Sequence, residues 1–179
     1  MLEVAGKLFY ANGIHAVGVD SIAAAAGVTK KTLYDRFGSK EALVAQYLSA
    51  RDERWRAHVR SVVERSARTA PARRPLLVFD ALAGWMATEN PRGCAFVNAH
   101  AELPDGAHPG RDVIRAQKEW MLGYLRSLVE AARLRNPARL SESLFVLLEG
   151  ATVAASLDVV PDAVTGAKRV AKQLLDSAV

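Results

Sequence analysis

The stretch VDSIAAAAGVTKKTLYDRFGSKEAL, residues 19–43, decides the fold of this chain. It has the pattern of two short helices joined by a tight turn. Gly27 can supply the positive φ that the turn needs, and Thr29 is a good N-cap for the second helix. That helix turns Leu33 and Phe37 towards the core. Its outward side chains are polar: Lys30, Lys31, Thr32 and Tyr34.

These two helices predict a helix-turn-helix whose second helix suits the major groove of DNA. Lysines at a helix N-terminus oppose the helix dipole, and a nearby polyanion would remove that conflict. Ser39 is the expected cap of the next helix, and Lys40 in its first turn adds donors suited to phosphate oxygens. The alternatives are a solvated charged turn for Lys30 and Lys31, and half-buried packing for Tyr34.

Composition excludes several classes of protein. The chain has 179 residues, half of them apolar, which is far too many for a disordered chain. A single Cys excludes an internal disulfide framework and a Cys-based metal site. The net charge of +5 permits an anionic partner without requiring one. The most apolar stretch, 144–160, carries two acidic residues, and the N-terminus lacks a signal-peptide pattern, so we expect a cytoplasmic protein without a membrane span.

Apolar residues recur every three or four positions in the rest of the chain, which predicts an all-α protein. Before a Pro- and Arg-rich linker at 65–75 we expect helices at 2–12, 19–26, 29–37 and from 40 onwards. Beyond the linker we expect helices at 76–90, 94–103, 111–133, 139–158 and 163–177. Prolines mark several of these boundaries, because the residue before a proline disfavours the α conformation.

Residues on both sides of the two short helices extend the pattern. They are Leu8, Phe9, Gly13, Val19, Ile22, Ala23, Ala26, Gly27, Val28, Lys30, Thr32, Leu33, Tyr34, Phe37 and the run Ser39–Leu43. This set resembles the DNA-binding domain of the TetR family of bacterial transcription regulators. Segments 92–99, 101–104 and 108–109 are similar to one subgroup of that family. Gly18 departs from the pattern, because the family usually has Ser or Thr at this N-cap.

The resemblance implies an all-α homodimer in which a three-helix head is joined by a long helix to a helical ligand-binding and dimerisation core. We therefore divide the chain into a helix-turn-helix domain, residues 1–45, and an effector-binding and dimerisation domain, residues 46–179. The implied function is that of a ligand-responsive transcription regulator, a repressor that a small effector releases from its operator. The implied partners are double-stranded operator DNA, that effector and a second copy of the chain. The implied DNA contacts are Thr29, Lys30, Lys31, Thr32, Tyr34 and Lys40.

The helix expected at 111–133 is apolar on two faces and is the centre of the predicted effector site. No Arg or Lys interrupts these faces in our interpretation, so we expect a flat or aliphatic, weakly charged effector. The candidate lining residues are Trp85, Met86, Phe96, Asn98, Gln117, Trp120 and Tyr124. The alternative is a fully packed core in which the aromatic side chains fill the space themselves.

Stripes of apolar and small residues on the last two helices predict the dimer interface, because small residues let helices approach closely. On the helix at 139–158 these are Leu144, Leu147, Ala151, Ala154 and Ala155. On the helix at 163–177 they are Val164, Ala167, Ala171 and Leu174.

Signals of catalysis are missing from the sequence. It has no Gly-x-Ser-x-Gly elbow and no Gly-rich phosphate loop, so we expect neither an enzyme nor a cofactor. Cys94 has no evident partner and is expected to be a buried structural thiol. Imidazole and carboxylate groups can bind metal ions, but the spacing of His100, Glu102, Asp105, His108 and Asp112 is not typical of a metal site. The alternative function is a helical enzyme or protein-interaction domain that does not bind DNA.

Overall fold

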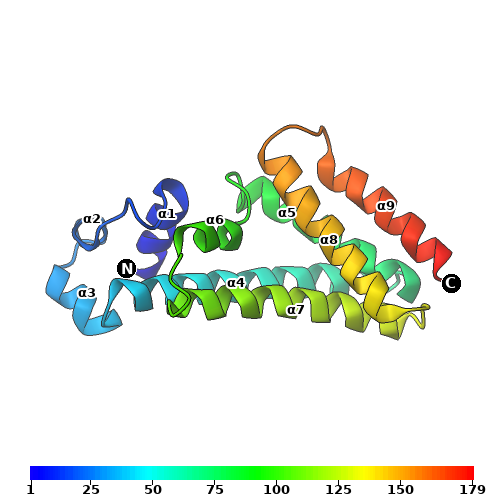
Figure 1. Ribbon diagram of the computed structural model, residues 1–179, viewed down its shortest axis with the longest axis horizontal. Coiled ribbons are helices and arrows are strands. Elements are labelled where there is room, and N and C mark those ends of the chain that lie inside the picture. Colours follow the sequence, from blue (N-terminus) through cyan, green and yellow to red (C-terminus); the bar gives the residue numbers. More distant parts are fainter. The chain divides into compact units, whose positions relative to one another are not determined.

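The computed structural model describes residues 1–179, which form nine α-helices and no strand (Figure 1). The helices are α1 (Leu2–Asn12), α2 (Val19–Ala25), α3 (Lys30–Phe37), α4 (Lys40–Arg65), α5 (Arg74–Thr88), α6 (Ala95–Glu102), α7 (Pro109–Ala131), α8 (Pro137–Ser156) and α9 (Ala163–Ser177). One turn of 3-10 helix, η1 (Pro71–Arg73), precedes α5. The predicted all-α fold is confirmed. No helix is long and apolar enough to span a membrane.

Three helices begin earlier than the sequence predicted, and proline is the reason in each case. Pro75, Pro109 and Pro137 lie in the first turn of α5, α7 and α8, whereas the sequence pattern predicts that each helix begins after its proline. Proline is favoured in a first turn, because its missing N–H would have no partner there and its φ is already helical. The predicted linker is correspondingly short, since η1 and α5 occupy residues 71–75.

The chain divides into two compact units, and α4 and α7 contribute to both. Unit 1 comprises residues 1–54 and 95–117, and unit 2 comprises residues 55–94 and 118–179. Unit 1 contains the predicted DNA-binding head together with α6. The predicted functional boundary at residue 45 is a different division, because it separates the DNA-binding segment from everything that follows it in sequence.

Unit 1 is built around buried side chains from its short helices. Phe9 of α1, Ile22 of α2 and Leu33 of α3 are all buried. The ring of Phe9 packs against that of Tyr47 on α4, with centroids 5.8 Å apart. Gly6 is required here, because a Cβ at this position would lie 2.8 Å from the Tyr47 ring. The ring contact fixes α1 on α4, and α2 packs against both α1 and α3.

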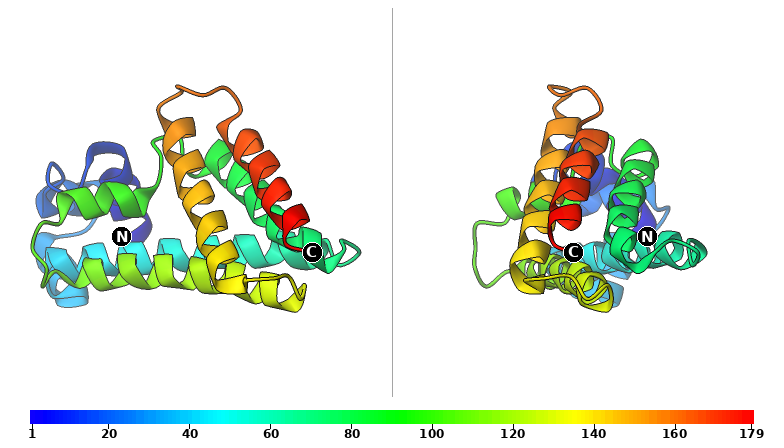
Figure 2. Two further views of the ribbon diagram at one scale, coloured as in Figure 1. Left: turned by 45° about the vertical axis from the view of Figure 1, so that its right-hand side comes forward. Right: turned by 90° about the vertical axis from the view of Figure 1, so that its right-hand side faces the viewer.

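Unit 2 has a larger core in which α9 packs against both α8 and α5 (Figures 1 and 2). Phe79, Leu125 and Leu175 are fully buried there. Figure 2 shows α8 and α9 running antiparallel, joined by the loop at 157–162. Arg135 fastens the C-terminal end of α9, because its backbone N–H and its guanidinium donate to the carbonyls of Ala178 and Ser177, at 2.9 and 3.0 Å.

Candidate DNA-binding surface and effector site

The start of α3 is fixed by the turn that the sequence predicted. Gly27 has φ +65°. The Oγ1 atom of Thr29 accepts the backbone N–H of Thr32 at 3.0 Å, and the two hydroxyl oxygens are 2.8 Å apart. The predicted cap of α3 is therefore confirmed. Ser39 caps α4 in the same way, accepting the backbone N–H of Ala42 at 3.0 Å.

The two lysines of α3 are held by carboxylates. Lys30 Nζ donates to Asp20 Oδ2 of α2 at 3.0 Å, and Lys31 Nζ donates to Asp35 Oδ2 at 2.6 Å. The hydrogen bond and the charge of Asp20 raise the pKa of Lys30. Lys30 thus ties α3 to α2, while the Lys31 pair lies along α3 itself. All four side chains are exposed, so phosphate groups can compete for the lysines.

The remaining predicted DNA contacts are also accessible. Tyr34 is exposed, and Lys40 in the first turn of α4 makes no ion pair. Glu41 follows Lys40, and hydrogen bonds from its own backbone N–H and from Ser39 lower its pKa. Asp20 and Asp35 were not predicted from the sequence, because the expected DNA contacts in this segment were donors to phosphate. The position of Asp35, four residues after Lys31 on one helix, was the signal that could have identified it.

A contact from α6 holds the turn between α1 and α2. Glu102 Oε2 accepts the backbone N–H of His15 at 2.9 Å. Gly13 lies beside the same carboxylate with φ +89°, and a Cβ there would come within 3.0 Å of Glu102 Oε2. Arg111 of α7 donates to the carbonyl of Leu103, directly after α6. The Glu102 contact thus joins α6 to the head, and the Arg111 contact joins the end of α6 to α7.

Two of the predicted effector residues, Trp120 and Tyr124, lie in unit 2 and pack against each other. Trp120 and Tyr124 stack with ring centroids 5.2 Å apart. The guanidinium groups of Arg56 and Arg60, on α4, lie 5.0 and 5.5 Å from the Trp120 ring centroid. Desolvation raises the pKa of Tyr124, with a further contribution from the charge of Glu64. Both aromatic side chains are half-buried beneath charged groups.

The other predicted effector residues are divided between the units. Trp85 is buried in unit 2, and its ring centroid lies 5.4 Å from that of Trp55 and 5.5 Å from that of His58. Met86 is half-buried in the same unit. In unit 1, Phe96 is buried and Asn98 is exposed. Gln117, also in unit 1, is only 4% exposed, and its Oε1 atom accepts no hydrogen bond.

The expectation that no cation interrupts the apolar faces of α7 is wrong. Lys118 is largely buried, with its side chain 23% exposed, and its Nζ atom donates to both carboxylate oxygens of Glu149 on α8 at 2.8 and 2.7 Å. The same Nζ atom lies 3.6 Å from Cys94 Sγ. Cys94 is therefore a half-buried free thiol beside an ammonium group, rather than the fully buried thiol that we expected. The sequence pattern concealed the pair because its members are 31 residues apart.

The residues weighed for a metal site do not form one. No group of three or more His, Cys, Asp or Glu side chains is arranged to hold a metal ion. Glu102 instead binds the His15 amide. Asp105 accepts the Ala107 N–H at 2.9 Å, and His108 Nδ1 accepts the Gly110 N–H at 3.0 Å, so both stabilise the turn before α7.

Comparisons with known proteins agree with this architecture. Two family models match the chain: bacterial regulatory proteins, tetR family, at residues 1–47, and tetracyclin repressor-like, C-terminal domain, at residues 71–171. The structure of a TetR-family transcriptional regulator from Streptomyces coelicolor is 32% identical, with a TM-score of 0.87 over 99% of this chain and 93% of that chain. This chain belongs to the TetR family. The resemblance seen in the sequence is confirmed.

Other TetR-family structures are similar over the same length. A regulator from Streptomyces avermitilis is 30% identical, with a TM-score of 0.85 over 99% of this chain and 94% of that chain. One from Chloroflexus aurantiacus shares the fold at 21% identity, with a TM-score of 0.83 over 99% of this chain and 93% of that chain. No curated protein matches the sequence. The TetR-family assignment makes the chain a DNA-binding transcriptional regulator.

Three of the predicted interface residues of this TetR-family chain are core residues. Leu144, Ala151 and Ala171 are buried within the protomer, because α8 and α9 turn these side chains towards each other and towards α5. The exposed apolar side chains of α8 are Val146 and Val153, with the exposed Gly150 between them. Leu157, the C-cap of α8, is also exposed, and α9 exposes Val170. The other predicted residues, Leu147, Ala154, Ala155, Val164, Ala167 and Leu174, are half-buried.

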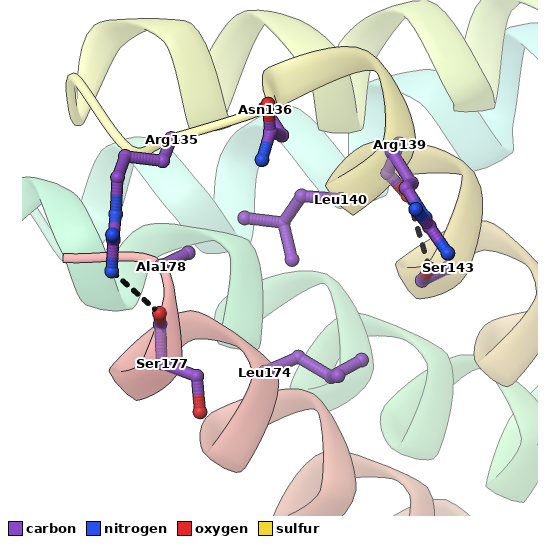
Figure 3. A pocket seen from close by; sticks show the side chains of 8 residues that line it. All are labelled: Arg135, Asn136, Arg139, Leu140, Ser143, Leu174, Ser177 and Ala178. Atoms are coloured by element: carbon purple, nitrogen blue, oxygen red, sulfur yellow. Dashed lines mark hydrogen bonds between the residues drawn. The ribbon is translucent and has the colours of Figure 1, made fainter.

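A hollow of about 320 Å³ lies between the start of α8 and the end of α9 (Figure 3). Arg135 and Arg139 lie on opposite sides of it, with Leu140 and Leu174 between them. Arg139 and Ser143 precede Val146 by seven and three residues, so they continue the same outward line of α8. None of the seven predicted effector residues lines this hollow.

Proposed function

We propose that this TetR-family regulator is a repressor that binds operator DNA as a homodimer and is released by a small, largely apolar effector. The observation that carries the DNA-binding part is the outward surface of α3. This surface presents Lys31, Thr32 and Tyr34 on a helix whose start is fixed by the Thr29 cap. Short capped helices of this kind enter the major groove, and their first turns reach the base edges.

Lysine substitutions test the DNA surface. Lys31→Ala should weaken binding to an operator selected from random DNA, by about 1–3 kcal/mol if Lys31 contacts a base. Lys40→Ala should weaken binding to all sequences alike and reduce the salt slope by about one per protomer, as expected for a phosphate contact. Lys172→Ala on α9 is the matched control, because this exposed lysine pairs with Asp176 far along the chain from α3. Unchanged affinity in both variants, with folding intact, contradicts the proposed surface.

The exposed stripe on α8 and α9 supports the homodimer. Val153 is 48% and Leu157 66% exposed, and Val146 and Gly150 continue their line at spacings of three and four residues. An apolar helical stripe of this length is most stable when a second copy covers it across a two-fold axis. The hollow in Figure 3 lies at one end of this line, where its open space can receive side chains of the partner.

Gln117 supports an effector that carries at least one hydrogen-bond donor. A buried acceptor without a partner costs about 1–3 kcal/mol, and a hydroxyl or N–H group of a ligand can recover this free energy. Lys118 does not favour a charged ligand, because Glu149 already neutralises it. The proposed effector is therefore mostly apolar, with a donor but without a net charge.

A thermal-shift screen tests the effector class. Neutral apolar compounds with a hydroxyl or N–H group should raise the melting temperature and release operator DNA, and a hit at 100 times its Kd should add about 2.7 kcal/mol of stability. In Gln117→Leu the protein should fold, whereas hits that use this amide should bind more weakly. If only charged compounds both shift melting and release DNA, the proposed effector class is wrong. The sign of regulation follows from transcription measured with and without the regulator.

A further inference from the structure

The face of α3 that points away from the core is centred on an acidic side chain. Successive residues of an α-helix are about 100° apart around its axis. Leu33 and Phe37 are the buried residues of α3. Around the helix axis, Asp35 lies about 160° from Leu33 and about 160° from Phe37. Lys31 lies about 160° from Leu33 and about 120° from Phe37. No other residue of α3 is as far from both buried side chains as Asp35.

Lys30 and Asp20 occupy a different position. Lys30 lies about 60° from Leu33 and about 20° from Phe37 around the axis, on the side of α3 that faces α2. Its partner Asp20 belongs to α2. The pair formed by Lys31 and Asp35 is therefore the one at the centre of the outward face, and that face meets the bases if α3 enters the major groove.

A carboxylate at this position restricts what can lie opposite it. A phosphate group or the acceptor atoms of guanine and thymine would repel it. The N6 amino group of adenine is flanked by acceptors, N7 on its own ring and O4 of the paired thymine. The N4 amino group of cytosine is a donor with guanine acceptors on one side only. Lys31 Nζ, 2.6 Å from Asp35 Oδ2, places a cation where it can serve those guanine acceptors.

We propose that Asp35 is a specificity-determining residue of the operator contact, which accepts a hydrogen bond from cytosine N4 while Lys31 donates to neighbouring guanine acceptors. A donor and an acceptor held side by side match the edge that a G·C pair presents in the major groove. This inference rests on the proposed function, because it requires α3 to lie in that groove. It goes beyond that function by assigning the base that each half-site contains at this position.

Selection from a random double-stranded DNA library tests the inference with the 179-residue chain and three variants. The parent protein should enrich sequences with a C·G pair at one fixed position in each half-site. Asp35→Asn should change the preferred base there to adenine, because an asparagine amide pairs with adenine N6 and N7. The ratio of the two affinities should change by about 5- to 150-fold. Asp35→Ala should lose the preference at that position and keep the rest of the sequence.

The control and the adverse outcomes separate this inference from the proposed function. Asp20→Asn also releases a lysine but lies on α2, so it should select the same sequence as the parent. If the parent enriches a sequence and both Asp35 variants enrich the same one, Asp35 does not read a base and the inference is overturned. If the parent enriches no sequence, the proposed function fails as well. Circular dichroism confirms folding of each variant before the selection.

Discussion

Replacing Val153 by arginine is expected to convert the regulator into monomers and to weaken operator binding by about 10²–10⁴-fold. Val153 lies in the middle of the exposed stripe of α8, and an arginine there would place an unpaired charge in a desolvated interface. A monomer that holds one half-site loses the gain from binding two sites at once, which is of this size. Light scattering gives the mass, and titration of the selected operator gives the affinity.

The choice of Val153 follows from the structure. Ala154, which the sequence alone would select, is half-buried beside the core, so an arginine there would disturb the protomer itself. Ala83→Arg is the matched control, because Ala83 is exposed on α5 and lies outside the stripe. A Val153→Arg protein that remains a dimer and binds the operator like the parent shows that the partner does not cover this face.

The second large effect is expected at Lys118. Lys118→Met should lower the free energy of unfolding by about 1–3 kcal/mol, because it leaves Glu149 largely buried without its partner. The Lys118→Met/Glu149→Leu double variant should recover most of this loss, since replacing both members of a buried pair by apolar groups is often neutral. Urea denaturation measures all four corners of the cycle. A loss in the double variant equal to the sum of the losses in Lys118→Met and Glu149→Leu would show that the pair has no coupling.

The same pair gives a pH dependence with a definite sign. Burial opposes the charge of Lys118, but negative charge on Cys94 and Glu149 outweighs it and raises the pKa above 10.5. A raised pKa in the folded state means that the stabilisation is fully present below about pH 10.5 and is lost as the pH rises through the folded value. Stability of the parent should therefore fall more steeply than that of the double variant above this pH.

Local chemistry made the head predictable from sequence. Gly27 at a positive φ, the Thr29 and Ser39 caps and the inward Leu33 and Phe37 are short-range signals, and the structure contains each of them. Helix periodicity likewise located α5 to α9 within two residues at each end. The residual errors lie at first-turn prolines, where one residue type both ends and begins helices.

Long-range contacts explain what the sequence did not reveal. The partner of Lys118 is 31 residues away, and that of Glu102 is 87 residues away, so neither contact leaves a periodic pattern. Three residues of the predicted interface lie in the protomer core for a related reason. Leu144 and Ala151 are apolar at helical spacing, as Val146 and Val153 are, and only the packing of α9 and α5 decides which line is buried.

The hydrogen bond from His15 to Glu102 makes one backbone amide a reporter of α6. The amide of His15 lies in an exposed turn, where solvent would normally exchange its proton quickly. While Glu102 accepts this proton, its exchange is slowed, and any event that draws α6 away from the turn releases it. Hydrogen exchange at this single amide therefore reports any displacement of α6 from the turn, and it does so when no DNA is present.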